Sequence, residues 1–128
     1  NNSMLRVRER STCRFPLSFK DDYGNAVPPD SLKWTLVDKA NNVINGRERV
    51  EVAAEDLSPE MHIYLSGADL QITDQTNPVE MRWLVVEATY TNSHGTGWPL
   101  NNSYDFEVEN VKYIKNLIYI IRVVSGHQ

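Results

Sequence analysis

Apolar and polar residues alternate with a period of two along most of this chain, and this pattern constrains the fold more than any other feature. In residues 13–20 the apolar members are Cys13, Phe15, Leu17 and Phe19, with polar residues or proline between them. The same alternation recurs in residues 32–36, 61–65, 84–90 and 104–108. Because successive side chains of a strand point to opposite faces, the pattern predicts half-buried β-strands.

Turn-forming residues separate these segments, and no long amphipathic helix stands between them. Asn45-Gly46 is a hairpin signal, the stretch SGADLQI at residues 66–72 is a predicted short helical turn, and residues 92–100 form a predicted loop. About seven short strands spaced in this way predict an all-β fold, an immunoglobulin-like antiparallel β-sandwich over residues 12–111. Trp34 is expected to be its core tryptophan, and the disulfide of antibody domains is absent because Cys13 is the only cysteine.

Charge is distributed unevenly along the chain, whose net charge is −4. Residues 21–110 contain five basic and sixteen acidic side chains, whereas both ends are basic. An acidic body argues against nucleic-acid binding, which requires a clustered basic face. We therefore expect residues 1–11 to be a basic arm that adds to the sheet of an acidic protein partner. The expected contact residues of this arm are Leu5, Arg6, Val7, Arg8 and Arg10.

The most apolar run of the chain, NLIYIIRVV, lies close to its end at residues 116–124. The run is far shorter than the roughly 20 residues of a membrane helix, so no membrane span is predicted. Both faces of the run are apolar when it is placed on a strand, and such a strand must be covered on both sides. Residues 112–128 are therefore predicted to form an intersubunit strand and tail. The expected contact residues are Tyr113, Leu117, Ile118, Tyr119, Ile120 and Ile121.

Residues with chemical reactivity do not form a recognisable catalytic or metal-binding motif. The three histidines lack metal-ligand spacing, and Cys13 falls on an inward strand position where a thiol is inert. Asp21, Asp22 and Asn25 are explained by turn formation, with a calcium site as the alternative. We therefore predict no enzyme activity, no cofactor and no metal. Trp98, with His94 in the same predicted loop, is the candidate ligand contact, although capping of the sandwich end also explains Trp98.

Tyr64 and Trp83 fall on the faces of their strands opposite to the aliphatic residues. We expect them to contribute to a second apolar patch on the outside of the sandwich. An exposed apolar patch indicates a binding partner.

Two stretches resemble small immunoglobulin-like proteins encoded among the structural genes of tailed bacteriophages. They are FKDDYGNAVPPDSLKWTLVDKANNVINGRE and, downstream, IYLSGADLQI with RWLVVEATYTNSHGTGWPLNNSYDFEVENV. The resemblance covers roughly residues 15–111 and rests on turn and core positions, with Asn in the NNVINGRE hairpin where the family more often has Gly. It implies a virion component without active-site residues.

These observations together predict a non-enzymatic virion structural protein that binds a capsid or head–tail assembly through its termini. Capsid decoration is favoured over a neck or tail position. The expected partners are the major capsid, portal-proximal or tail proteins, in a homo-oligomer without nucleic acid or membrane, in particles assembled in the host cytoplasm. The alternative is a surface module that recognises a host glycan or receptor through residues 92–100.

Overall fold

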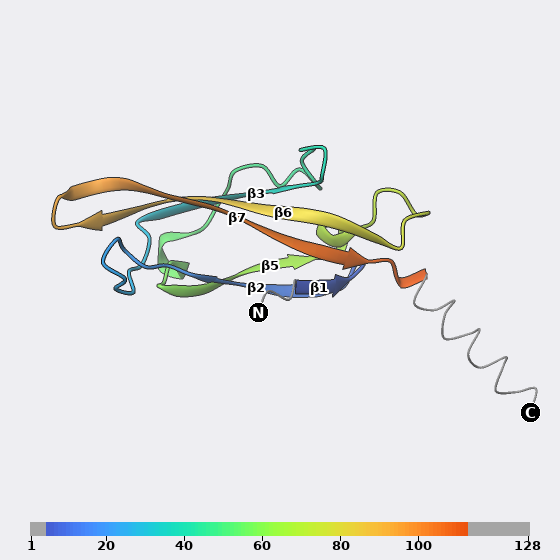
Figure 1. Ribbon diagram of the computed structural model, residues 1–128, viewed down its shortest axis with the longest axis horizontal. Coiled ribbons are helices and arrows are strands. Elements are labelled where there is room, and N and C mark those ends of the chain that lie inside the picture. Colours follow the sequence, from blue (N-terminus) through green and yellow to red (C-terminus); the bar gives the residue numbers. More distant parts are fainter. Residues whose placement is uncertain (1–4, 113–128) are drawn as a thin grey trace, which may run out of the picture.

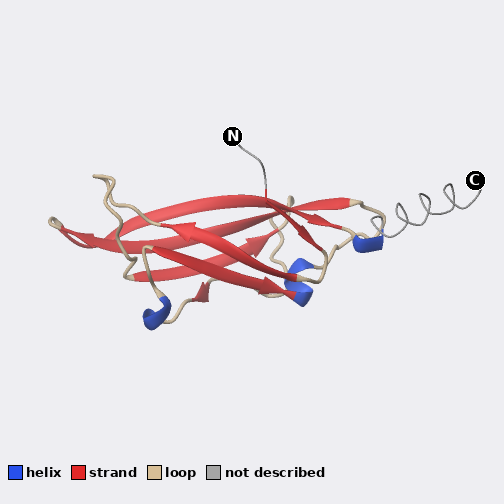
Figure 2. Ribbon diagram, turned by 90° about the horizontal axis from the view of Figure 1, so that it is seen from below, coloured by secondary structure: helices blue, strands red, loops and turns tan. Residues whose placement is uncertain are grey.

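The computed structural model describes residues 5–112, which form a β-sandwich of two sheets (Figure 1). The helical segments of this part are short turns at the ends of strands or between them (Figure 2). In chain order the elements are β1 (Leu5–Arg8), β2 (Thr12–Ser18), β3 (Ser31–Val37), β4 (Val50–Glu51), the 3₁₀ turn η1 (Ala54–Asp56), β5 (Glu60–Ser66), the 3₁₀ turn η2 (Gly67–Leu70), β6 (Val79–Asn92) and β7 (Gly95–Glu109). The predicted all-β class is confirmed.

The two sheets have unequal numbers of strands. The larger sheet has five strands in the order β1-β7-β6-β3-β4, and the smaller sheet pairs β2 with β5. All pairings are antiparallel except that of β1 with β7, which is parallel. The smaller sheet therefore has one free edge on β2 and one on β5 within the described residues.

The core lies between the sheets and consists of the residues that the alternation places on the inner faces. Leu36, Leu65, Leu84 and Phe106 are fully buried, and Trp34 is 6% exposed. The Phe15 ring on β2 lies 5.6 Å from that of Phe106 on β7, so the sheets interlock through aromatic contacts. All buried residues of this cluster fall between positions 13 and 108.

The segment 92–100 is part of a hairpin rather than the loop expected from the sequence. Strands β6 and β7 pair from Val79 opposite Glu109 to Asn92 opposite Gly95, with an irregularity between Tyr90 and Asn92. The hairpin extends beyond one end of the sandwich (Figure 1). The chain reverses at residues 93–94, and the residues on either side of this turn continue the two strands.

Residues 5–8 belong to the sandwich and do not form the separate arm expected from the sequence. Strand β1 pairs with residues 106–109 of β7 in the same chain. Arg6 forms an ion pair of 2.9 Å with Glu107, and half-buried Val7 packs against the core. The alternation of Leu5, Arg6, Val7 and Arg8 therefore serves pairing within the chain, with its charges facing an acidic strand.

Candidate functional site: a groove at an open edge

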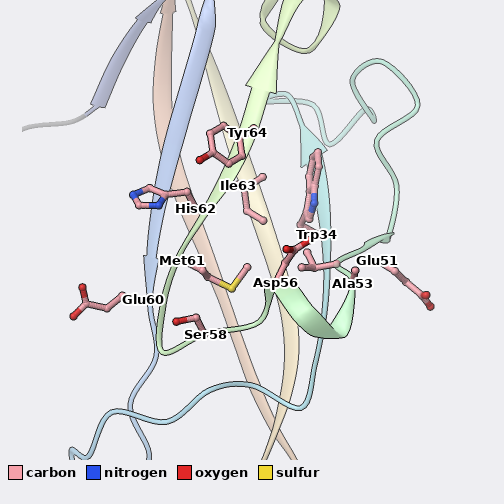
Figure 3. Close-up of a pocket in the computed structure, with 11 residues that line it drawn as sticks. Trp34, Glu51, Ala53, Asp56, Ser58, Glu60, Met61, His62, Ile63 and Tyr64 are labelled. Carbon is pink, nitrogen blue, oxygen red and sulfur yellow. The ribbon is translucent and has the colours of Figure 1, made fainter.

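A groove of about 620 Å³ lies where the edge strands of the two sheets face each other. One wall is β5 of the smaller sheet, and the other contains β4 and the segment that includes η1 (Figure 3). The lining residues are Trp34, Glu51, Val52, Ala53, Asp56, Ser58, Glu60, Met61, His62, Ile63 and Tyr64.

The deep part of the groove is apolar and continuous with the core. Trp34 of β3 and Ile63 of β5 lie on opposite sides of the gap, with Met61 farther along β5 (Figure 3). All three side chains are buried, with exposed fractions of 4–6%. Apolar side chains that enter such a groove would extend the existing core.

The rim of the groove is acidic. Glu51, Asp56 and Glu60 are exposed carboxylates at its margin, and no lysine or arginine lines it. Lys33 on the neighbouring strand approaches Glu51 at 3.8 Å and offsets part of this charge. The groove therefore favours an apolar ligand that carries positive charges.

The outer edge of β5 presents free backbone groups. Two hydrogen bonds flank the β2–β5 ladder: Phe19 N–H donates to Pro59 O at 2.8 Å, and Gly67 N–H donates to Ser11 O at 3.1 Å. Hydrogen-bonded pairs alternate along an antiparallel ladder, so the odd-numbered residues of β5 bond to β2. The backbone groups of His62 and Tyr64 consequently point away from β2, and no other described strand pairs with them.

The outer edge of β2 differs because a proline interrupts it. Pro16 lies opposite His62 in the register, so its backbone nitrogen faces the outer edge. Proline has no N–H to donate, and it is a common means of blocking strand addition at an exposed edge. Of the two free edges of the smaller sheet, β5 is therefore the better suited to accept a strand.

The sequence-predicted contact residues lie at different places. Residues 5–8 form the outermost strand of the larger sheet, and Arg10 lies in the turn that follows, where its N–H donates to Leu70 O at 3.2 Å. This strand lies on the opposite side of the larger sheet from β4 and the groove. The predicted C-terminal contact residues, Tyr113, Leu117, Ile118, Tyr119, Ile120 and Ile121, lie outside the described residues.

Trp98 and His94 lie near the tip of the β6–β7 hairpin. Trp98 is 43% exposed and pairs across the hairpin with Tyr90. His94 is exposed in the turn, where its N–H donates to the Asn92 side chain at 2.8 Å. Neither Trp98 nor His94 is among the residues that line the groove. Tyr64 and Trp83 also do not share a patch, because they lie on outer faces of different sheets.

A buried polar cluster that the sequence reasoning missed closes the end of the sandwich where β6 begins. Arg82 is 1% exposed and donates to Glu80 at 2.8 Å and to Gln71 O at 3.0 Å. Burial disfavours ionised Glu80, but hydrogen bonds from Thr73, Asn77, Asp74 and Arg82 outweigh this and lower its pKa to about 2. The position of Arg82 was a usable signal, since it shares the inward face of β6 with Leu84.

Asp69 and Asn110 fix two further segments at this end. Asp69, also 1% exposed, accepts hydrogen bonds from Arg47 at 2.7 Å and Asn45 at 2.8 Å, which attaches the 44–47 turn to η2. Burial raises the pKa of Asp69, but these bonds outweigh it and the net direction is downward. Asn110 is fully buried and donates to the backbone of Gln75 and Asn77, which fixes the chain just after β7.

Within residues 5–112 no three metal-ligating side chains come together. In the turn that contains Asp21, Asp22 and Asn25, the Asp21 carboxylate accepts the N–H groups of Tyr23 and Asn25, both at 2.9 Å, so it stabilises the turn. No helix in this part of the chain is long and apolar enough to cross a membrane. Comparisons with protein-family models, curated proteins and solved structures gave no match for this chain.

Proposed function

We propose that this chain is a non-enzymatic structural subunit of a tailed-bacteriophage virion, with an immunoglobulin-like fold. It joins its neighbours through strand addition at open sheet edges. The single observation that carries the interaction role is the incomplete smaller sheet, whose β5 edge lies beside an apolar groove with an acidic rim. An unpaired edge next to buried apolar side chains is a template for another chain.

The strand order supports the immunoglobulin-like assignment. In an immunoglobulin sandwich strands B and E share one sheet, and C, F and G share the other. Strands β2 and β5 correspond to B and E, and β3, β6 and β7 correspond to C, F and G. Trp34 occupies the core position on the C-like strand, and Cys13 lies on the B-like strand without a disulfide partner.

The virion assignment rests on the sequence resemblance at turn and core positions described above. Capsid decoration remains the preferred location, ahead of the neck or tail. Quantitative mass spectrometry of particles purified from the encoding phage tests the assignment. On the order of hundreds of copies per particle are expected for decoration and about six or twelve for a ring at the neck or tail. Absence of the chain from purified particles would refute the virion role.

A second candidate function is supported by the exposed Trp98 on the projecting hairpin. An exposed tryptophan with an amphipathic ring is a common anchor for a sugar or protein ligand. Glycan-array screening of the native chain and of Trp98→Ala tests this candidate. Binding that disappears in the variant would favour a host-surface recognition module over an assembly subunit.

A further inference from the structure

We propose that the groove beside β5 receives residues 113–124 of a second copy of this chain, which add to the smaller sheet as a third strand. This inference rests on the proposed assembly function and specifies the partner and the contact. Three observations carry it: the receptive β5 edge, the chemistry of the groove, and the composition of the chain that follows residue 112.

The β5 edge is suited to strand addition. The outward backbone groups of His62 and Tyr64 have no partner among residues 5–112, whereas Pro16 blocks the corresponding position on β2. Each added backbone hydrogen bond contributes about 0.5–1.5 kcal/mol. Because Pro16 interrupts the β2 edge, the smaller sheet is better suited to grow from β5.

The chemistry of residues 113–124 complements the groove. The segment YIKNLIYIIRVV is rich in β-branched and aromatic residues, which favour strands, and it contains no acidic side chain. Its two charges, Lys115 and Arg122, are positive, whereas the groove rim carries Glu51, Asp56 and Glu60. Apolar residues match the floor and basic residues match the rim.

The fixed end of β7 favours donation to another copy. Asn110 N–H donates to Pro78 O at 2.9 Å, and its side chain bonds to two further backbone oxygens of the same loop. In the larger sheet β6 and β3 separate β7 from β4, which flanks the groove. At the usual strand spacing β7 and β4 are about 14 Å apart, and the two sheets are separated by about 10 Å. Residues 110–112 span roughly 10 Å at most, so a chain folding back on itself would use part of the apolar run for the crossing.

Charge pairing gives a specific antiparallel register. If Arg122 lies opposite Glu60, the residue numbers of facing positions add to 182, and Ile118 lies opposite Tyr64. Facing residues in a strand pair point to the same side of the sheet. Leu117, Tyr119 and Ile121 then face the core beside the buried residues of β5, and Ile118 and Ile120 face outward.

The first experiment measures the mass of the full chain by light scattering during size-exclusion chromatography. The native chain is expected to elute above the monomer mass of 14.7 kDa at micromolar concentration. Tyr64→Pro removes an outward N–H without touching the β2 ladder, and is expected to weaken association at least tenfold. Tyr64→Ala is the matched control, because it removes the exposed side chain and retains the N–H. A monomeric native chain, or undiminished association of Tyr64→Pro, would overturn the proposal.

Hydrogen exchange provides a second readout that does not depend on the proline variant folding. The amides of His62 and Tyr64 are expected to exchange slowly in the full chain at concentrations where it associates, and rapidly after dilution to the monomer. Fast exchange at both concentrations would contradict strand addition at β5. Slow exchange in a monomer would instead show that residues 113–124 occupy the groove of their own chain, and it would contradict the proposed binding by a second copy.

A charge-reversal pair tests the register. Glu60→Arg is expected to weaken association by up to about fivefold, and combining it with Arg122→Glu is expected to restore affinity. If the double variant does not regain affinity, this register is rejected. These results are separable from the virion assignment: a chain found in particles with an unprotected β5 edge would retain the proposed function and lose this inference.

Discussion

Replacing Glu80 with glutamine isolates the contribution of the polar cluster to folding. Both carboxylate oxygens of Glu80 accept two hydrogen bonds: Oε1 from Thr73 N–H and Arg82 Nη2, and Oε2 from Asp74 N–H and Asn77 Nδ2, at 2.8–2.9 Å. All four partners are donors. A glutamine has only one acceptor oxygen. Its NH₂ group would therefore face two of these donors, with which it cannot form hydrogen bonds, and Arg82 would lose its ionic partner in a buried site.

The magnitude follows from the pKa of Glu80, which falls from 4.5 to about 2 because the bonds to its charged form outweigh burial. This difference corresponds to about 3 kcal/mol of stability. Since the folded-state pKa lies below the unfolded one, the stabilisation is complete above about pH 4.5 and is lost as the pH falls towards 2. Glu80→Gln is therefore expected to lower the free energy of unfolding by about 3 kcal/mol at pH 7 and by much less near pH 2.

Urea denaturation followed by tryptophan fluorescence at pH 7, 5 and 3 measures this difference. Asp38 and Asp69, whose pKa values are also lowered, are present in both chains and do not contact Glu80, so their contributions cancel in the comparison. Glu107→Gln is a matched control, because it removes an ion pair with Arg6 at the surface and is expected to cost under about 1 kcal/mol. A loss in Glu80→Gln below about 1 kcal/mol at pH 7, or one that does not change with pH, would refute the reasoning.

Three further predictions concern other parts of the fold. Asp69→Ala leaves Asn45 and Arg47 without their buried acceptor and is expected to lower the free energy of unfolding by about 2 kcal/mol, measured by urea denaturation. An unchanged midpoint would contradict the attachment of the 44–47 turn to η2. Burial raises the pKa of the Cys13 thiol, so a thiol reagent is expected to react slowly with the folded chain. In urea the same reagent is expected to label one thiol per chain. Rapid labelling of the folded chain would show that β2 is open. Trp98→Ala is expected to change the melting temperature little, because the side chain lies outside the core; a large drop would show that it caps the sandwich.

The period-two pattern predicted the inner faces of the sheets well. The inward positions of residues 13–19, 32–36, 61–65 and 84–90 are all buried. The left-handed backbone of Asn45 and Gly46, with Arg47 N–H donating to Ile44 O at 3.0 Å, shows a tight turn at the predicted position, but no two described strands pair across it, so the predicted hairpin does not form. Burial on one face of a strand is a local property of the sequence, so a local pattern is sufficient to find it.

Strand pairing and polar burial were harder to predict because both depend on distant residues. Nothing near Leu5–Arg8 indicates that β7, about one hundred residues later, is its partner. Glu9 is 4% exposed because the backbone of Ile72 and the side chain of Gln75 meet its carboxylate. A charged residue is ordinarily placed outside by sequence rules, and only its tertiary partners reverse that expectation.

The two sides of the sandwich are closed by different means, and this asymmetry determines how copies could join. On one side the chain itself crosses between the sheets from β1 to β2, and Pro16 blocks the remaining edge. On the other side the segment 52–59 covers the gap and leaves β5 free beside the groove.

The end of β7 is adjacent to β1, on the closed side of the larger sheet. Donor and receiver are therefore different surfaces of one subunit, so the contact is heterologous unless two copies exchange segments reciprocally. A heterologous contact builds a ring or an open array rather than a simple dimer, and a ring is the closed arrangement that such one-directional strand addition permits.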